Sequence, residues 1–132
     1  MTYPMKTNKI VIQILRIFLA ALLLVFSLNG FIGFLPMPVP PEPAAEFLRA
    51  MSEAGFVFPV LYGIELVLGV FLLLNYYTPF VLIAFVPIAL SILLYHLFLD
   101  PLGGVAGYLT VGIGIILLWA YFDYYKPLLK VK

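Results

Sequence analysis

The 132-residue sequence contains no cysteine, a single histidine and few charges. The lack of cysteine excludes disulfides, thiolate catalysis and iron–sulfur ligation. One histidine excludes bis-histidine haem ligation within one chain. Charged residues make up 10% of the sequence, against about 25% in soluble domains. The net charge is +1, so no basic stripe indicates a nucleic-acid partner.

Most of the sequence is hydrophobic. Hydrophobic residues make up 65% of the chain and aromatic residues 17%, which excludes both an ordinary soluble globule and a disordered chain. A membrane-spanning helix needs about 20 mostly apolar residues, and four segments qualify: about 10–34, 56–74, 79–99 and 105–122. We therefore predict an all-α fold, a bundle of four transmembrane helices in a lipid bilayer, with residues 1–132 as one integral membrane domain. No internal repeat relates its two halves.

The connection between the first two spans has structure of its own. It begins with a proline-rich stretch, and Pro43 then starts a short amphipathic helix that Gly55 ends. Phe47, Leu48 and Met51 form its apolar face. We predict a short interfacial helix here, which serves either as a connector over the ends of the spans or as a lid.

The basic residues predict the topology. Six of the seven lie near the two ends of the chain: Lys6, Lys9, Arg16, Lys126, Lys130 and Lys132. Only Arg49 lies in the first connection. The positive-inside rule therefore predicts that both termini are cytoplasmic and that residues 36–55 lie outside. The first span is too long for a signal peptide and lacks a small-residue cleavage site, so we expect it to be retained.

Three polar side chains are predicted to converge in the outer half of the bundle. Cα–Cβ bonds tilt toward the N-terminus of a helix. Because the second span runs inward, Glu65 leans outward, whereas Asn29 and His96 lean inward from the first and third spans. Tyr62 lies one turn from Glu65 as a hydrogen-bond partner. At the opposite end, Arg16 is predicted to snorkel toward the cytoplasm, away from Glu65.

These positions allow two interpretations. Ionisable residues inside a membrane are costly and often functional, which favours a ligand-binding or proton-handling site at Glu65, His96, Asn29, Tyr62 and Asp100. Alternatively, the same groups only join helices. Glu65 would then satisfy a neighbouring polar group, His96 would hold Asp100 one turn later, and Asn29 would bond a backbone carbonyl. One histidine and two acids at different depths match no recognised metal-ligand spacing, so no metal site is predicted.

Small residues line one face of the last span. Gly103 and Gly107 are four residues apart, and Thr110 and Gly114 follow on roughly the same face. Such a face allows close helix packing. Alternatively, the glycines leave room for a flat ligand beside the backbone.

Several stretches together resemble the DoxX-like family of small four-helix bacterial membrane proteins. They are residues 29–38 (NGFIGFLPMP), residues 54–56 (AGF), Glu65 with Gly69, and residues 96–101 (HLFLDP). The resemblance extends from about Arg16 to about Tyr125. The family takes its name from a membrane subunit of a thiosulfate:quinone oxidoreductase.

The resemblance implies a bacterial inner-membrane location and a redox setting. The chain would be an accessory subunit that binds a quinone or a similar amphipathic molecule as its cofactor, together with a redox protein partner. Two other functions remain open: a non-catalytic assembly or interaction subunit, and a small proton-coupled carrier that acts as a homo-oligomer. Whether the chain is itself an enzyme is left open.

Overall fold

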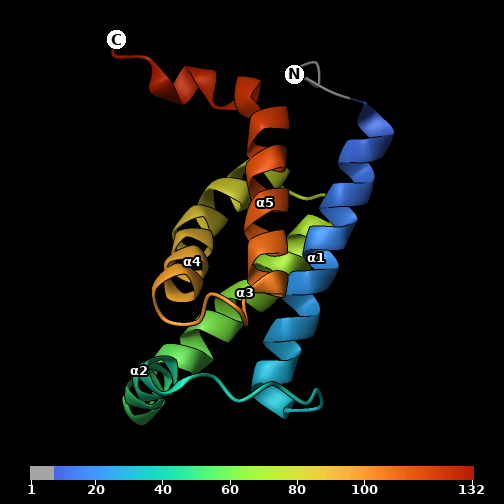
Figure 1. The fold of residues 1–132 in the computed structure, drawn as a ribbon. Helices are drawn as coiled ribbons and strands as arrows, with labels where there is room; N and C mark the ends of the chain where they lie inside the picture. The colour runs from blue at the N-terminus through green and yellow to red at the C-terminus, as the bar shows by residue number, and fades with distance from the viewer. Residues whose placement is uncertain (1–7) are drawn as a thin grey trace.

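The computed structural model describes residues 8–132, and within this range the chain is all-helical (Figure 1). Five α-helices follow one another: α1 (Lys9–Ile32), α2 (Glu42–Glu53), α3 (Val57–Leu74), α4 (Thr78–Phe98) and α5 (Val105–Ala120). Two 3-10 turns, η1 (Phe122–Tyr124) and η2 (Lys126–Leu129), complete the C-terminus. The predicted fold class is confirmed. Lys6, one of the basic residues in the topology argument, lies outside the described residues.

Local sequence signals end and start the helices. Gly33 closes α1 with a left-handed backbone (φ 74°) and donates its N–H to the Asn29 carbonyl. Asn75 closes α3 in the same way (φ 59°), since asparagine tolerates this conformation better than most residues. Pro79 stands in the first turn of α4, where its missing N–H is not needed. The α-helical bounds therefore lie within about two residues of the predicted ones.

Four of the helices are apolar along their length. Of these, α1, α3 and α4 are long and apolar enough to cross a membrane, whereas α5 is shorter, with 16 residues. Large apolar side chains are exposed all around the bundle, among them Ile14, Phe80 and Ile115. A surface of this kind is suited to lipid and not to water. The protein is therefore a helical membrane protein.

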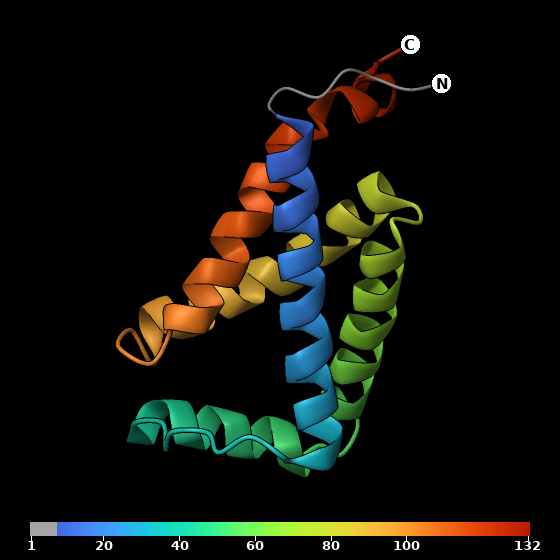
Figure 2. The same cartoon turned by 90° about the vertical axis from the view of Figure 1, so that its right-hand side faces the viewer.

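The bundle is built from two helix pairs. The helix α1 packs along α3, and α4 packs along α5, while contacts of α1 with α5 and of α3 with α4 join the pairs. The start of α1 and the C-terminal segment lie at the same end of the bundle (Figures 1 and 2). We call this the terminal end. The short helix α2 lies across the opposite end, which we call the α2 end (Figure 2).

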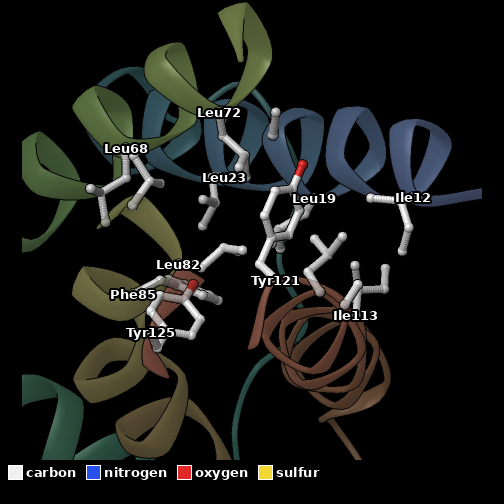
Figure 3. Close-up of a cluster of buried hydrophobic side chains, with 14 residues drawn as sticks. Ile12, Leu19, Leu23, Leu68, Leu72, Leu82, Phe85, Ile113, Tyr121 and Tyr125 are labelled. Carbon is white, nitrogen blue, oxygen red and sulfur yellow. The ribbon is translucent and has the colours of Figure 1, made fainter. Parts of the chain in front are cut away.

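The hydrophobic core is formed by buried side chains that four helices direct toward one another (Figure 3). Its buried side chains come from the first half of α1, the second half of α3, the first half of α4 and the second half of α5: for example Leu19, Leu72, Leu82 and Leu117. Tyr121 and Tyr125, beyond α5, complete it. The same helices contribute fewer fully buried apolar side chains toward the α2 end, and this difference determines where a cavity is found.

The predicted short helix in the first connection is α2. Ala44 is fully buried, and the ring of Phe47 lies 6.0 Å from that of Tyr95 in α4. Phe47 itself remains partly exposed. These contacts hold α2 against the bundle while its charged face stays exposed.

The snorkelling predicted for Arg16 is wrong. The side chain is buried, with 6% of its surface exposed. Its Nη1 donates hydrogen bonds to the carbonyls of Leu72 (2.5 Å) and Leu73 (3.0 Å), and its Nε donates to Gln13 Oε1 (3.0 Å). The last carbonyls of a helix have no partner within the helix and lie at the negative end of its dipole. Arg16 therefore caps the C-terminus of α3.

The C-terminal segment is fastened to the start of α4. The hydroxyl of Tyr125 donates to the Pro79 carbonyl at 2.8 Å, and Tyr125 is buried. Next to this contact, Thr78 Oγ1 donates to Asn75 Oδ1 at 2.6 Å. The turn between α3 and α4 and the end of the chain thus form one structural unit.

Candidate functional site

A cavity of about 340 Å³ lies between the two helix pairs in the half of the bundle toward α2. All four apolar helices contribute to its wall, and Met37 of the first connection closes part of it. Most of the wall is apolar; its polar side chains are Asn29, Tyr62, Glu65, His96 and Thr110. A largely apolar cavity with a few converging polar groups is the usual form of a small-molecule site.

Four of the five predicted site residues line this cavity. Asn29, Tyr62, Glu65 and His96 come from α1, α3 and α4, so the structure brings together the side chains that the tilt of their Cα–Cβ bonds predicted to converge. Asp100 is not among the lining residues. A role of the four in ligand binding stays a prediction.

Glu65 faces the cavity without a hydrogen-bond partner. Only 7% of its surface is exposed, and within residues 8–132 its carboxyl makes no hydrogen bond. The predicted bond from Tyr62 is not formed. The Tyr62 ring instead stacks on Phe58 with ring centroids 5.6 Å apart and meets Phe31 edge-on at 5.8 Å. Aromatic packing therefore fixes the position of Tyr62.

The hydrogen bond of His96 determines the state of its ring. Its Nδ1 lies 3.3 Å from the backbone carbonyl oxygen of Asp100. A carbonyl can only accept, so a hydrogen bond at this distance requires the hydrogen on Nδ1, and a neutral ring in that tautomer offers Nε2 as an acceptor. The predicted link between His96 and Asp100 is thus made to the backbone. The Asp100 carboxylate accepts the N–H of Gly103 at 3.2 Å instead, which explains its absence from the cavity wall.

Glycines of the last helix and its approach leave space for the His96 ring. A Cβ atom on Gly104 would lie 2.8 Å from His96 Cγ, and one on Gly107 would lie 2.6 Å from Cδ2 and 2.7 Å from Nε2. Gly30 of α1 leaves the same kind of space for the Tyr62 ring. The sequence left open whether glycines served helix packing or a ligand. In the structure they accommodate two side chains of the cavity wall.

The amide of Asn29 is oriented by the chain that follows α1. Its Oδ1 accepts the backbone N–H of Leu35 at 2.6 Å. The bond joins Asn29 to the backbone, as one interpretation predicted, but to an N–H and not to a carbonyl. Its Nδ2 group makes no hydrogen bond within the described residues. Asn29 therefore fixes the start of the proline-rich stretch and still presents two N–H donors at the cavity.

Thr110 is the polar wall residue that sequence reasoning assigned to packing alone. Its Oγ1 donates to the Ala106 carbonyl one turn earlier, at 2.8 Å, which leaves the oxygen able to accept. Its position one turn beyond Gly107, on the face toward His96, was the signal that could have placed it in the site. Within residues 8–132, no group of three or more histidine, cysteine or acidic side chains could hold a metal ion.

Comparisons with family models, with curated proteins and with solved structures gave no match for this chain. The resemblance to the DoxX-like family therefore stays a prediction.

Proposed function

We propose that this protein binds a small amphipathic molecule whose polar head occupies the cavity between the two helix pairs. The observation that carries the proposal is Glu65, a side chain with 7% of its surface exposed that lines a largely apolar cavity and makes no hydrogen bond within residues 8–132. A ligand oxygen or hydroxyl in the cavity would supply the missing bond.

The dimensions and chemistry of the cavity support a head group of one ring. Small-molecule sites measure about 300–1,000 Å³, and a volume of about 340 Å³ is near the lower limit. Four further polar side chains line the same space: Asn29, Tyr62, His96 and Thr110. A ring that carries oxygen atoms on opposite sides could bond to several of them, and its apolar tail would extend into the lipid.

The biological setting rests on the sequence. The resemblance to the DoxX-like family supports a bacterial inner-membrane protein, an accessory subunit of a redox system with a quinone as ligand and a redox protein as partner. The excess of basic residues near the two ends supports cytoplasmic termini.

The test uses the protein purified gently from membranes. Wild type, Glu65→Gln, His96→Ala and the double variant are compared by mass spectrometry of extracted small molecules, by absorption spectra and by thermal unfolding. We expect a stoichiometric ligand in the wild type and less ligand in each folded variant. Because residues of one site are coupled, the stability losses should depart from additivity by about 0.5–3 kcal/mol. Glu46→Gln, on the exposed face of α2, is the matched control.

The same experiment distinguishes the rival functions. Additive losses with no ligand in any variant would contradict the proposal. With strong retention of a partner protein, that result would favour an assembly subunit. Proton-coupled flux in liposomes, lost in Glu65→Gln, would favour a carrier.

A further inference from the structure

Three polar groups of the cavity wall, His96, Asn29 and Thr110, have a fixed hydrogen-bonding polarity; the Thr110 hydroxyl donates to the Ala106 carbonyl and is left as an acceptor. At His96, the bond from Nδ1 to the Asp100 carbonyl leaves Nε2 as an acceptor. At Asn29, the bond from the Leu35 N–H occupies Oδ1 and fixes the orientation of the amide, so that Nδ2 offers donors. No other group within residues 8–132 donates to His96 Nε2. A ligand that bonds to both groups must therefore donate a hydrogen bond to His96 Nε2 and accept one from Asn29 Nδ2.

The other two candidate groups adapt to either polarity. The Tyr62 hydroxyl donates and accepts, and a carboxyl such as that of Glu65 accepts when ionised and both donates and accepts when protonated. These side chains can bond to almost any oxygen of a ligand. Discrimination between ligands therefore falls to the groups of fixed polarity, His96, Asn29 and Thr110.

The His96 ring is held in place. Gly104 and Gly107 receive it closely on the side of α5. The ring of Tyr95 meets it edge-on with centroids 4.9 Å apart, and that of Tyr108 lies 5.8 Å away. A flip of the ring about the Cβ–Cγ bond would place Cδ2 where Nδ1 now lies and lose the bond to Asp100. The acceptor at Nε2 is therefore a persistent property of the neutral side chain.

We propose that His96 makes the site selective for ligands that present a hydroxyl hydrogen, so that a hydroquinone binds more tightly than the corresponding quinone. The inference rests on the proposed function and specifies its ligand. A hydroquinone can donate to His96 Nε2 through one hydroxyl, while its other oxygen accepts from Asn29 Nδ2. A quinone carries only acceptors, and its carbonyl would place a lone pair against the lone pair of Nε2.

The test measures binding of decylubiquinol and decylubiquinone to the full chain in lipid nanodiscs, with oxygen excluded. A buried acceptor left without a donor costs about 1–3 kcal/mol, and each 1.4 kcal/mol corresponds to tenfold in affinity. We expect wild type to bind the quinol about tenfold more tightly. His96→Phe keeps a ring between the glycines and should abolish the preference. Tyr108→Phe, which removes the neighbouring hydroxyl bonded to the Pro101 carbonyl, should preserve it.

The single histidine of the sequence allows a second measurement that needs no variant. In protein labelled with ¹⁵N-histidine, nuclear magnetic resonance should show one protonated and one bare ring nitrogen. The signal of the bare nitrogen should shift when the quinol is added and stay in place with the quinone.

The outcomes separate this inference from the proposed function. Equal or tighter binding of the quinone by wild type would overturn the selectivity and leave ligand binding intact. A ring protonated at Nε2 would also overturn it. Failure of both probes to bind would contradict the proposed function for a quinone-type ligand, and the selectivity would fail with it.

Discussion

Arg16 and Asn29 show how single polar side chains are retained inside an apolar bundle. Each bonds to backbone groups at or beyond the end of a helix: Arg16 to the carbonyls of Leu72 and Leu73 at the end of α3, and Asn29 to the N–H of Leu35 just beyond α1. Such groups must find a partner away from water. Glu65 differs because its carboxyl makes no hydrogen bond within the described chain, which is why the proposed ligand is assigned to it.

Replacement of Arg16 by lysine should destabilise the protein. The guanidinium bonds two carbonyls and Gln13 Oε1 in a planar arrangement, and one ammonium nitrogen cannot reproduce that geometry. We expect Arg16→Lys to lower the free energy of unfolding by about 1–3 kcal/mol. Unfolding by increasing denaturing detergent in mixed micelles measures it.

Arg49→Lys, at an exposed position on α2, serves as the control and should leave stability unchanged. If Arg16→Lys behaved like this control, the capping role would be wrong and the snorkelling interpretation would return.

At the scale of elements, two glycines of α5 differ in how closely other side chains approach them. Gly107 faces the His96 ring, whereas a Cβ atom on Gly112 would meet nothing within 4 Å. The two positions lie on the same helix, so one tests close packing and the other tests only the helix preference of alanine over glycine.

Gly107→Ala should destabilise the protein and disturb the cavity. The added methyl group forces the His96 ring to move, and overpacking of this kind costs about 1–3 kcal/mol. Gly112→Ala should instead be neutral or raise stability by up to about 1 kcal/mol. Thermal unfolding of the two variants compares them, and equal effects at both positions would contradict the packing of His96 against α5.

The contact of the C-terminal segment with α4 should fail at high pH. Burial raises the pKa of Tyr125, and the neighbouring Tyr121 raises it further. Because the pKa in the folded state lies above the unfolded value of about 10, the contribution of Tyr125 is fully present below that pH and is lost as the pH rises above it. The temperature at which wild type unfolds should therefore fall at alkaline pH.

Tyr125→Phe should reduce this alkaline loss, and it should lower stability at neutral pH because the bond to the Pro79 carbonyl is removed. Tyr76→Phe, at an exposed position, is the control. An unchanged alkaline slope in Tyr125→Phe would contradict the assignment.

At the scale of the whole molecule, hydrophobic patterning predicted most of the fold. Long apolar segments and the glycine, asparagine and proline residues at their ends determined the helices, and helix geometry predicted that Glu65, His96 and Asn29 converge. The partners of Arg16 and His96 were not predictable, since they are backbone atoms whose positions depend on how the helices pack. The cavity in the half of the bundle toward α2 likewise depends on side-chain volumes in three dimensions and not on any local sequence pattern.

The arrangement of the ends predicts the accessibility of the chain from each side. The start of α1 and the C-terminal segment lie at one end and α2 at the other (Figure 2). Since the sequence has no cysteine, single cysteines near residue 45 and at the C-terminus report cleanly. An impermeant thiol reagent applied to intact cells should label only residue 45. Labelling of the C-terminal cysteine alone would contradict the predicted orientation and place the termini outside.

The length of α5 has a consequence for the surrounding membrane. Sixteen residues at 1.5 Å each give a helix about 24 Å long, shorter than a hydrocarbon layer of about 30 Å. A short span causes hydrophobic mismatch, which a bilayer relieves by thinning locally at a modest cost for each ångström. We therefore expect the bilayer to be thinner beside α5 than beside α1 and the protein to prefer thinner regions of its membrane.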